Sequence, residues 1–461
     1  MCTTYLAHLL VERLAEAGEV GRPHLLRLNP AIEHKTRGNA ALAVATGVAP
    51  ATAFTLAREL VEEFAETADP NTDPGVVVAP TDSWAGDGLD AVVSFARSAV
   101  RDRLTVADAE RLLALTGYDH ASWGVGRGRI GALAAVGGLV ARHAGSGDAP
   151  GVDESGDGQG VDGSDAYRTD ESGGDLGTDG GDAPAGPVAA FRDWTYETIA
   201  YREERRWGTP REVDVDSVFA ADAAYDAPAV FDTVDRVERE AVCVPHTPGP
   251  VLHGIRGEDP EACEAVSRAI EGEPATARRT FVTNQGTDAH LRDGTVGGVA
   301  EGRAYRVPGR VVEPPETRQG GHVFLAIAPP DADAPTLSCV AFEPTKRFRD
   351  RVRALRPGDR LLACGEVGEG PTLKLEKFAV RELVRTAPAV PDCPGCGRRM
   401  ESAGRGQGYR CRDCGTSADG KATVPLERDL EVGWYEVPPT ARRHVARPLC
   451  RGGFDAPLHP G

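Results

Sequence analysis

The chain has 461 residues, a hydrophobic content of 41% and a formal net charge of −18 at pH 7. This length fits about three domains of roughly 150 residues each. No stretch approaches the ~20 consecutive apolar residues of a membrane-spanning helix. No basic, signal-like segment opens the chain, so we expect it to be cytoplasmic.

Residues 1–144 predict an α/β domain, because helical and extended patterns alternate along them. Apolar residues recur at helical spacing over residues 3–17 and 51–67. Short apolar runs at residues 24–30, 40–47 and 76–79 predict strands, and the first of these ends at the turn signal Asn29-Pro30. A helix rich in small residues follows near residue 128.

Two segments of this domain are candidate phosphate-binding loops. Backbone N–H groups at glycines, helix N-termini and guanidinium groups all suit phosphate. The chain has only five lysines, and one of them lies in the first loop. Neither loop is a Walker A motif or a dinucleotide fingerprint, so the spacing alone leaves nucleotide binding open. The loops comprise Lys35, Thr36, Arg37, Gly38 and Asn39, and then Gly126, Arg127 and Gly128.

Residues 145–188 consist mainly of Gly, Asp and Ser, and we expect a disordered acidic linker or insertion because such a composition cannot bury a core. Residues 189–290 then predict a small α+β unit. Its expected strands lie at residues 229–235, 240–245 and 279–285, and its expected helix at 261–272. The polar run TNQGTDAH at residues 283–290 is either a site or a loop.

Residues 291–388 predict a small β-barrel, most plausibly an OB-fold, because five to six short strands are separated by turn residues. This region also contains a dense group of cations, which with stacking aromatic rings is typical of a nucleic-acid-binding groove. A solvated basic helix face is the alternative. The candidate nucleic-acid-binding residues of this group are Lys346, Arg347, Arg349, Arg351, Arg353 and Phe348.

Residues 389–418 predict a zinc ribbon. Cys393, Cys396, Cys411 and Cys414 have the spacing C-x₂-C-x₁₄-C-x₂-C, which supplies four thiolates to a tetrahedral Zn²⁺. Four protein ligands leave no open coordination position, so this zinc is expected to be structural. Residues 419–461 are expected to form a mostly irregular C-terminal tail.

The chain carries eight segments in a fixed order: MCTTYLA, RLNPAIEHKTRGNAA, NTDPGVVV, GRGRIGALAA, PVLHGIRG, TNQGTDAH, AFEPTKRFRD and the cysteine cluster. In these segments it resembles the archaeal tRNA 2-agmatinylcytidine synthetase family. The resemblance implies a multidomain α+β fold: a kinase-like α/β catalytic domain (1–144), a region (189–290) that holds the rest of the catalytic part and a ferredoxin-like domain, an OB-fold β-barrel (291–388) and the ribbon.

The activity implied by the resemblance is an ATP-dependent ligation. Agmatine is attached to carbon 2 of the wobble cytidine of isoleucine tRNA with a CAU anticodon, so that the tRNA decodes AUA. The implied cofactors are ATP, Mg²⁺ and structural Zn²⁺, and the implied partners are tRNA and agmatine, without a membrane. Lys35 and Arg37 are implied as catalytic phosphate clamps, and Thr3 as the autophosphorylated residue.

The sequence departs from the family pattern at one place. In the family a strand and an acidic loop of the form G-I-D-D-T-D-S precede the M-C-T-T motif, whereas Met1 of that motif opens this sequence. Aspartates of such a loop would be Mg²⁺ ligands. We expect either a start placed at an internal methionine or a form that binds tRNA and turns over poorly. The alternative function is a non-catalytic nucleic-acid-binding protein built on the OB-fold and the ribbon.

Overall fold

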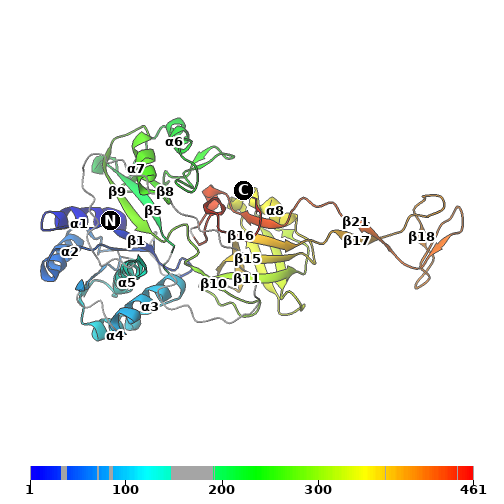
Figure 1. Ribbon diagram of the computed structural model, residues 1–461, viewed down its shortest axis with the longest axis horizontal. Coiled ribbons are helices and arrows are strands. Elements are labelled where there is room, and N and C mark those ends of the chain that lie inside the picture. The colour runs from blue at the N-terminus through cyan, green and yellow to red at the C-terminus, as the bar shows by residue number, and fades with distance from the viewer. Residues whose placement is uncertain are drawn as a thin grey trace, which may run out of the picture. The chain divides into compact units, whose positions relative to one another are not determined.

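The structure is a computed structural model, which describes residues 2–32, 39–69, 72–81, 87–146, 191, 193–368, 370–443 and 445–459. The chain divides into two compact units (Figure 1). Unit 1 comprises Met1–Val234 and Ala241–Ala289, and unit 2 comprises Asp235–Glu240 and His290–Gly461. Lys35, Thr36, Arg37 and Gly38 lie outside the described residues, as does the expected acidic linker from residue 147 onward.

Unit 1 is built on a five-stranded sheet in the order β2-β1-β9-β5-β8. The pair β1–β9 is parallel and the other pairs are antiparallel. The strands at residues 24–30, 40–47 and 279–285 are confirmed, as β1, β2 and β9. The bounds are β1 His24–Arg27, β2 Ala40–Ala43, β5 Thr195–Arg202, β8 Val251–Gly257 and β9 Ala275–Thr283.

The helices of unit 1 have local causes that the sequence displays. Pro50 opens α2, and its buried residues Ala53, Ala57, Leu60 and Val61 recur on one face. A capping box between Thr105 and Asp108 starts α4. The bounds are α1 Thr3–Ala15, α2 Pro50–Phe64, α3 Asp87–Arg101, α4 Val106–Thr116, α5 Gly128–Ser146, α6 Val215–Asp222 and α7 Pro260–Ala269.

Two short strand pairs lie outside the five-stranded sheet. The pair β3 (Gly75–Val78) and β4 (Asp119–Ser122) lies against α2 and α5. The strands predicted at residues 229–235 and 240–245 are wrong in extent, since only β6 (Val234–Asp235) and β7 (Glu240–Ala241) form there. The cause is a turn: the Asp235 carboxylate accepts the N–H groups of Val237 and Glu238, both at 3.1 Å.

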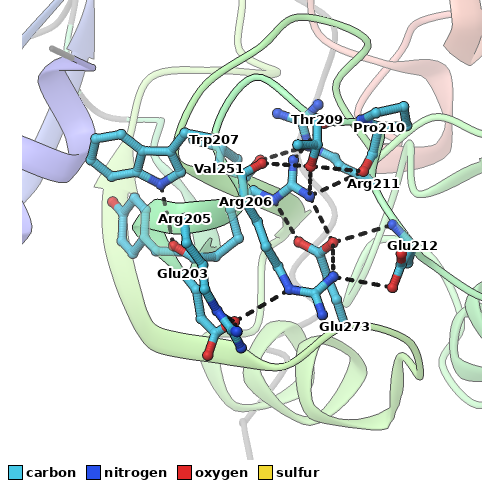
Figure 2. A network of polar contacts seen from close by, with 12 residues as sticks. Glu203, Arg205, Arg206, Trp207, Thr209, Pro210, Arg211, Glu212, Val251 and Glu273 are labelled. Carbon is cyan, nitrogen blue, oxygen red and sulfur yellow. Dashed lines mark hydrogen bonds and ion pairs between the residues drawn. The ribbon is translucent and has the colours of Figure 1, made fainter.

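A buried ion pair fixes the loop that follows β5 and contains the 3₁₀ helix η3 (Glu204–Arg206). Arg202 Nε and Nη2 bind the two oxygens of Glu273 at 2.5 and 2.7 Å, and both side chains are fully buried. Arg202 also donates to the carbonyl oxygens of Thr209 and Pro210. Figure 2 shows how Arg206 approaches the same Glu273 carboxylate, 3.4 Å away. Arg202 and Arg206 therefore both hold this loop through the Glu273 carboxylate.

Unit 2 contains a closed five-stranded barrel, in which β15 pairs with both β11 and β16 and so joins the ends of the path β11-β13-β14-β16. The predicted small barrel is confirmed. Phe348 and Val352 of α8 are buried in its core. The bounds are β10 Leu291–Asp293, β11 Arg303–Val311, β12 Glu316–Thr317, β13 Val323–Ala328, β14 Leu337–Ala341, η4 Glu343–Thr345, α8 Phe348–Arg353, β15 Arg360–Val367 and β16 Thr372–Glu382.

The cysteine-rich segment is a set of short strands connected to the barrel through the pair β17–β21. After it, the chain returns to the barrel, where β22 pairs with β16, so the segment expected as an irregular tail contains a core strand. The bounds are β17 Thr386–Ala389, β18 Glu401–Ser402, β19 Tyr409–Arg410, β20 Ser417–Ala418, β21 Ala422–Pro425, β22 Gly433–Glu436, η5 Pro439–Ala441, η6 Leu449–Arg451 and β23 Leu458–His459.

Lys377 of β16 anchors this returning segment. Its side chain is buried, and Nζ donates to the carbonyl oxygen of Arg447 at 3.0 Å. The ammonium group also lies 4.7 Å from the ring centroid of Phe454 and 5.5 Å from that of Trp434. Over the residues that the structure describes, no helix is long and apolar enough to cross a membrane.

Candidate functional site

Unit 1 encloses a cavity of about 1440 Å³ bounded by α1, α2, α5 and the strands β2 and β3. Most of its wall is apolar. Polar residues enter the wall where elements begin: Thr3 is the first residue of α1, Asn39 precedes β2, Asp73 precedes β3, and Arg127 and Gly128 form the start of α5. The positive end of the helix dipole at the start of α5 favours an anion at this wall.

The loop before α5 is a tight, glycine-dependent turn. Gly124 and Gly126 have φ values of +60° and +83°, which side-chain-bearing residues rarely adopt. Gly128 lies so close to the backbone of Gly75 that a Cβ on either residue would overlap the other. This contact sets the start of α5 against the start of β3. The predicted Gly-Arg-Gly segment therefore forms a loop beside the cavity, and this loop contains Gly126, Arg127 and Gly128.

Asp73 ties this loop to β3, and the sequence reasoning left it without a role. Its Oδ1 accepts the Val125 N–H at 2.7 Å, and its Oδ2 lies 3.5 Å from Arg127 Nη1. The Asp73 side chain is 8% exposed, whereas that of Arg127 is 47% exposed. A signal was available in the segment NTDPG, where an acidic residue precedes a Pro-Gly turn.

Of the first candidate loop, the structure describes Asn39. Its φ is +35°, and its Nδ2 donates to the carbonyl oxygen of Asn29 at 2.6 Å. The following residue, Ala40, pairs with Arg27 of β1. The KTRGN segment thus ends at the cavity wall.

The TNQGTDAH segment is a buried connector between strands. Asn284 Oδ1 accepts the N–H of Arg27 at 2.7 Å and its Nδ2 donates to the Arg27 carbonyl at 3.0 Å, which continues the β1–β9 pairing. Gln285 Nε2 donates to the buried carboxylate of Glu197 at 2.7 Å. Burial lowers the pKa of Arg27, against the opposing effect of Glu197 at 3.5 Å. The segment therefore fixes the sheet end beside α1.

The four cysteines of the predicted ribbon converge. Their Sγ atoms all lie within 4.8 Å of one another, with Cys393–Cys414 at 3.2 Å and Cys396–Cys411 at 3.5 Å. Zn–S bonds of about 2.3 Å in a tetrahedron require S···S distances near ~3.8 Å. Each knuckle closes with a glycine at φ +73°, Gly397 and Gly415. This thiol set fits a structural zinc ion.

The basic group of unit 2 is partly engaged inside the protein. Phe348 is 1% exposed and packs against Phe378, so its ring is not available for base stacking, and that prediction is wrong. Arg347 binds the buried carboxylate of Asp235 at 3.2 Å. Arg349 donates to the Gly321 carbonyl at 2.7 Å. The remaining members lie on the surface: Lys346 and Arg353, which face Glu238 and Asp350, and Arg351.

Family models match three segments of the chain: the TiaS TCKD domain at residues 1–53, the TiaS FLD domain at 176–290 and the TiaS C-terminal zinc ribbon domain at 390–430. The isoleucine tRNA 2-agmatinylcytidine synthetase TiaS of Haloquadratum walsbyi is 45% identical, over 100% of this chain and 96% of its own length.

Two solved structures are similar along nearly the whole chain. The crystal structure of a complex of TiaS with an isoleucine tRNA and ATP matches with a TM-score of 0.78 and 37% identity, over 99% of this chain and 95% of that one. The crystal structure of a complex of TiaS with an isoleucine tRNA, AMPCPP and agmatine matches with a TM-score of 0.76 and 35% identity at the same coverage.

Proposed function

The chain belongs to the tRNA 2-agmatinylcytidine synthetase family, TiaS, and from that membership we propose that it is an ATP-dependent enzyme that joins agmatine to carbon 2 of the wobble cytidine of isoleucine tRNA with the anticodon CAU. The observation that carries this proposal is the 45% identity over the full chain. ATP, tRNA and agmatine are bound species in the complexes of the similar structures. A tRNA substrate also supports a cytoplasmic location.

The chemistry requires activation of a poor leaving group. We propose that a phosphoryl group from ATP is transferred to the oxygen on carbon 2 of cytosine. The amine of agmatine then attacks carbon 2, the C–O bond breaks, phosphate leaves and the amine loses a proton. Phosphoryl transfer depends mainly on positioning and on neutralising charge. The target base must leave its stack to reach a buried site.

The residues we propose for phosphate binding are those of the two loops. Lys35 and Arg37 supply charge, and the start of α5 supplies the positive end of a helix dipole. The support is that Asn39, Arg127 and Gly128 all line one cavity. Thr3 lines it too, at the exposed start of α1, which is compatible with its autophosphorylation. The full set is Lys35, Thr36, Arg37, Gly38, Asn39, Gly126, Arg127 and Gly128.

Mg²⁺ is expected with ATP and binds one or two carboxylates together with phosphate oxygens. The cavity wall carries the carboxylates of Asp69, Asp73 and Asp102. Asp73 already accepts hydrogen bonds from the loop before α5. These three carboxylates of the described cavity wall are the ones that would hold a Mg²⁺ ion, and the ion would neutralise charge on the transferred phosphate when bound.

We propose the family's architecture for the chain: a kinase-like catalytic domain at 1–144, a ferredoxin-like domain within 189–290, an OB-fold at 291–388 and a ribbon at 389–418. The OB-fold is supported by the parallel pair β14–β16, which closes the barrel, and by α8 between β14 and β15. For tRNA we retain Lys346, Arg349, Arg351 and Arg353, whose contacts would be to the backbone.

The test is agmatine incorporation. The purified chain is mixed with ATP, Mg²⁺, labelled agmatine and the CAU-anticodon isoleucine tRNA in high salt, beside a methionine tRNA with the same anticodon. We expect label in the isoleucine tRNA alone, and loss of it in the double variant K35A/R37A. Tight tRNA binding without any label would refute the enzyme and favour the binding-module alternative.

A further inference from the structure

Asp73 makes two different contacts with the loop that precedes α5. One is to the backbone, because Oδ1 accepts the Val125 N–H at 2.7 Å. The other is to a side chain, because Oδ2 lies 3.5 Å from Arg127 Nη1. A Cβ on Gly124 would overlap Oδ1, so the loop has been shaped around this carboxylate. The two contacts have separate consequences and can be separated by substitution.

We propose that Asp73 is a positioning residue for the phosphate groups of ATP, which it serves by orienting Arg127. This proposal rests on the proposed function, in which Arg127 contacts phosphate. Asp73 does not have to touch the substrate for this role. It is nearly buried, whereas half of the Arg127 side chain is exposed at the cavity wall.

The geometry suits one carboxylate that restrains one guanidinium. An arginine has five N–H donors, and the contact with Asp73 uses one of them, on Nη1. The remaining donors can still form the bidentate contact that guanidinium makes with phosphate. An arginine side chain that is already restrained loses less rotamer freedom on binding. Asp73 thus raises the affinity of Arg127 for phosphate and leaves most donors of the guanidinium available for it.

The competing explanation is that Asp73 only clips the loop through the Val125 N–H. The substitution Asp73→Asn separates the two. Its amide oxygen can still accept the Val125 N–H, but its NH₂ group presents donors to Arg127, which also offers only donors. If the backbone clip is the whole role, D73N binds ATP as the unaltered chain does.

The experiment is a double-mutant cycle on ATP affinity, measured by titration calorimetry with the full chain. Loss of a charge-assisted contact to phosphate is expected to weaken ATP binding about 10- to 100-fold in R127A. D73N is expected to weaken it about tenfold, and D73N/R127A should be no weaker than R127A, because residues that act through each other are not additive.

Two results would overturn the proposal itself. If D73N binds ATP with unchanged affinity, the only role of Asp73 is its hydrogen bond to the Val125 N–H. Additive losses in the double variant would mean that Asp73 acts independently of Arg127. Unchanged affinity in R127A, or no ATP binding by the unaltered chain, would instead defeat the proposed phosphate site itself. D333N is the matched control, because Asp333 pairs with Arg310 at 2.6 Å on the surface of unit 2 and is 92% exposed.

Discussion

The ion pair between Arg202 and Glu273 offers the sharpest test of how unit 1 is held together. In the variant Glu273→Gln, the guanidinium stays buried and loses its counter-charge, while the loop after β5 loses the carboxylate that Arg206 also contacts (Figure 2). Both side chains are fully buried, so water cannot replace the lost partner. Breaking one side of such a pair costs about 3 to 5 kcal/mol.

The double variant R202M/E273L removes both charges and fills similar volume. Since it leaves no unpaired buried charge, we expect it to be more stable than either single variant and close to the unaltered chain. The surface variant D333N removes an exposed pair and should cost less than ~1 kcal/mol. The order of the three losses follows from burial alone.

The assay is urea denaturation of the full chain at constant high salt, followed by circular dichroism and by tryptophan fluorescence. Trp207 contributes to this fluorescence, and its Nε1 donates to the Arg202 carbonyl at 3.3 Å. Burial raises the pKa of Glu273, but the hydrogen bonds from Arg202 and the other favourable contacts lower it by more, so the net shift of the pKa is downward. The stabilisation is therefore present above pH ~4.5 and is lost as the pH falls through the folded-state pKa. A loss below ~1 kcal/mol in E273Q would refute the reasoning.

Three further predictions concern single sites. In C396S the zinc content, measured by atomic absorption, should fall from about one ion per chain to well below one, because three thiolates no longer close the tetrahedron. Burial, and to a smaller extent Arg278, lower the pKa of His253 to about 4. The free energy of unfolding should therefore decrease as the pH falls below 6.5, by about 2 kcal/mol at pH 5. Urea titrations of H253Q should lack this pH-dependent decrease. K377M should destabilise unit 2 by about 1 to 3 kcal/mol in urea, because the Arg447 carbonyl loses a buried donor.

Local sequence signals predicted those parts of the fold that have local causes. Residue spacing predicted the four-cysteine cluster, and short strand-like runs separated by turn residues predicted the barrel, which has five strands. The strand β8 was missed, although its burial alternates along part of its length. The segment around Asp235 reads as a strand, but its own carboxylate closes a turn there.

The sequence predicted the loops of the candidate site, but it did not predict which residues those loops contact. Glycines at residues 126 and 128 indicated a loop before a helix, and that loop forms. Its link to Asp73 spans 54 positions and exists because α5 packs on β3. The polar run around Asn284 was an equally good candidate for a site, but the side-chain amide of Asn284 pairs with the backbone of β1 instead. Polar residues mark a place where backbone groups need partners as readily as one where ligands bind.

The arginines of this acidic chain show that cation density alone does not tell which cations are free to contact a nucleic acid. Arg347 and Arg428 are counter-ions of the buried Asp235 and Asp359. In the ribbon, by contrast, three arginines form no ion pair among the residues described by the structure, and only two are paired, Arg398 with Asp413 and Arg412 with Glu401. The unpaired ones are Arg399, Arg405 and Arg410. A cation without a protein partner can release a counter-ion from a phosphate without first breaking an internal contact, so the salt dependence of tRNA affinity should arise more from the ribbon than from α8.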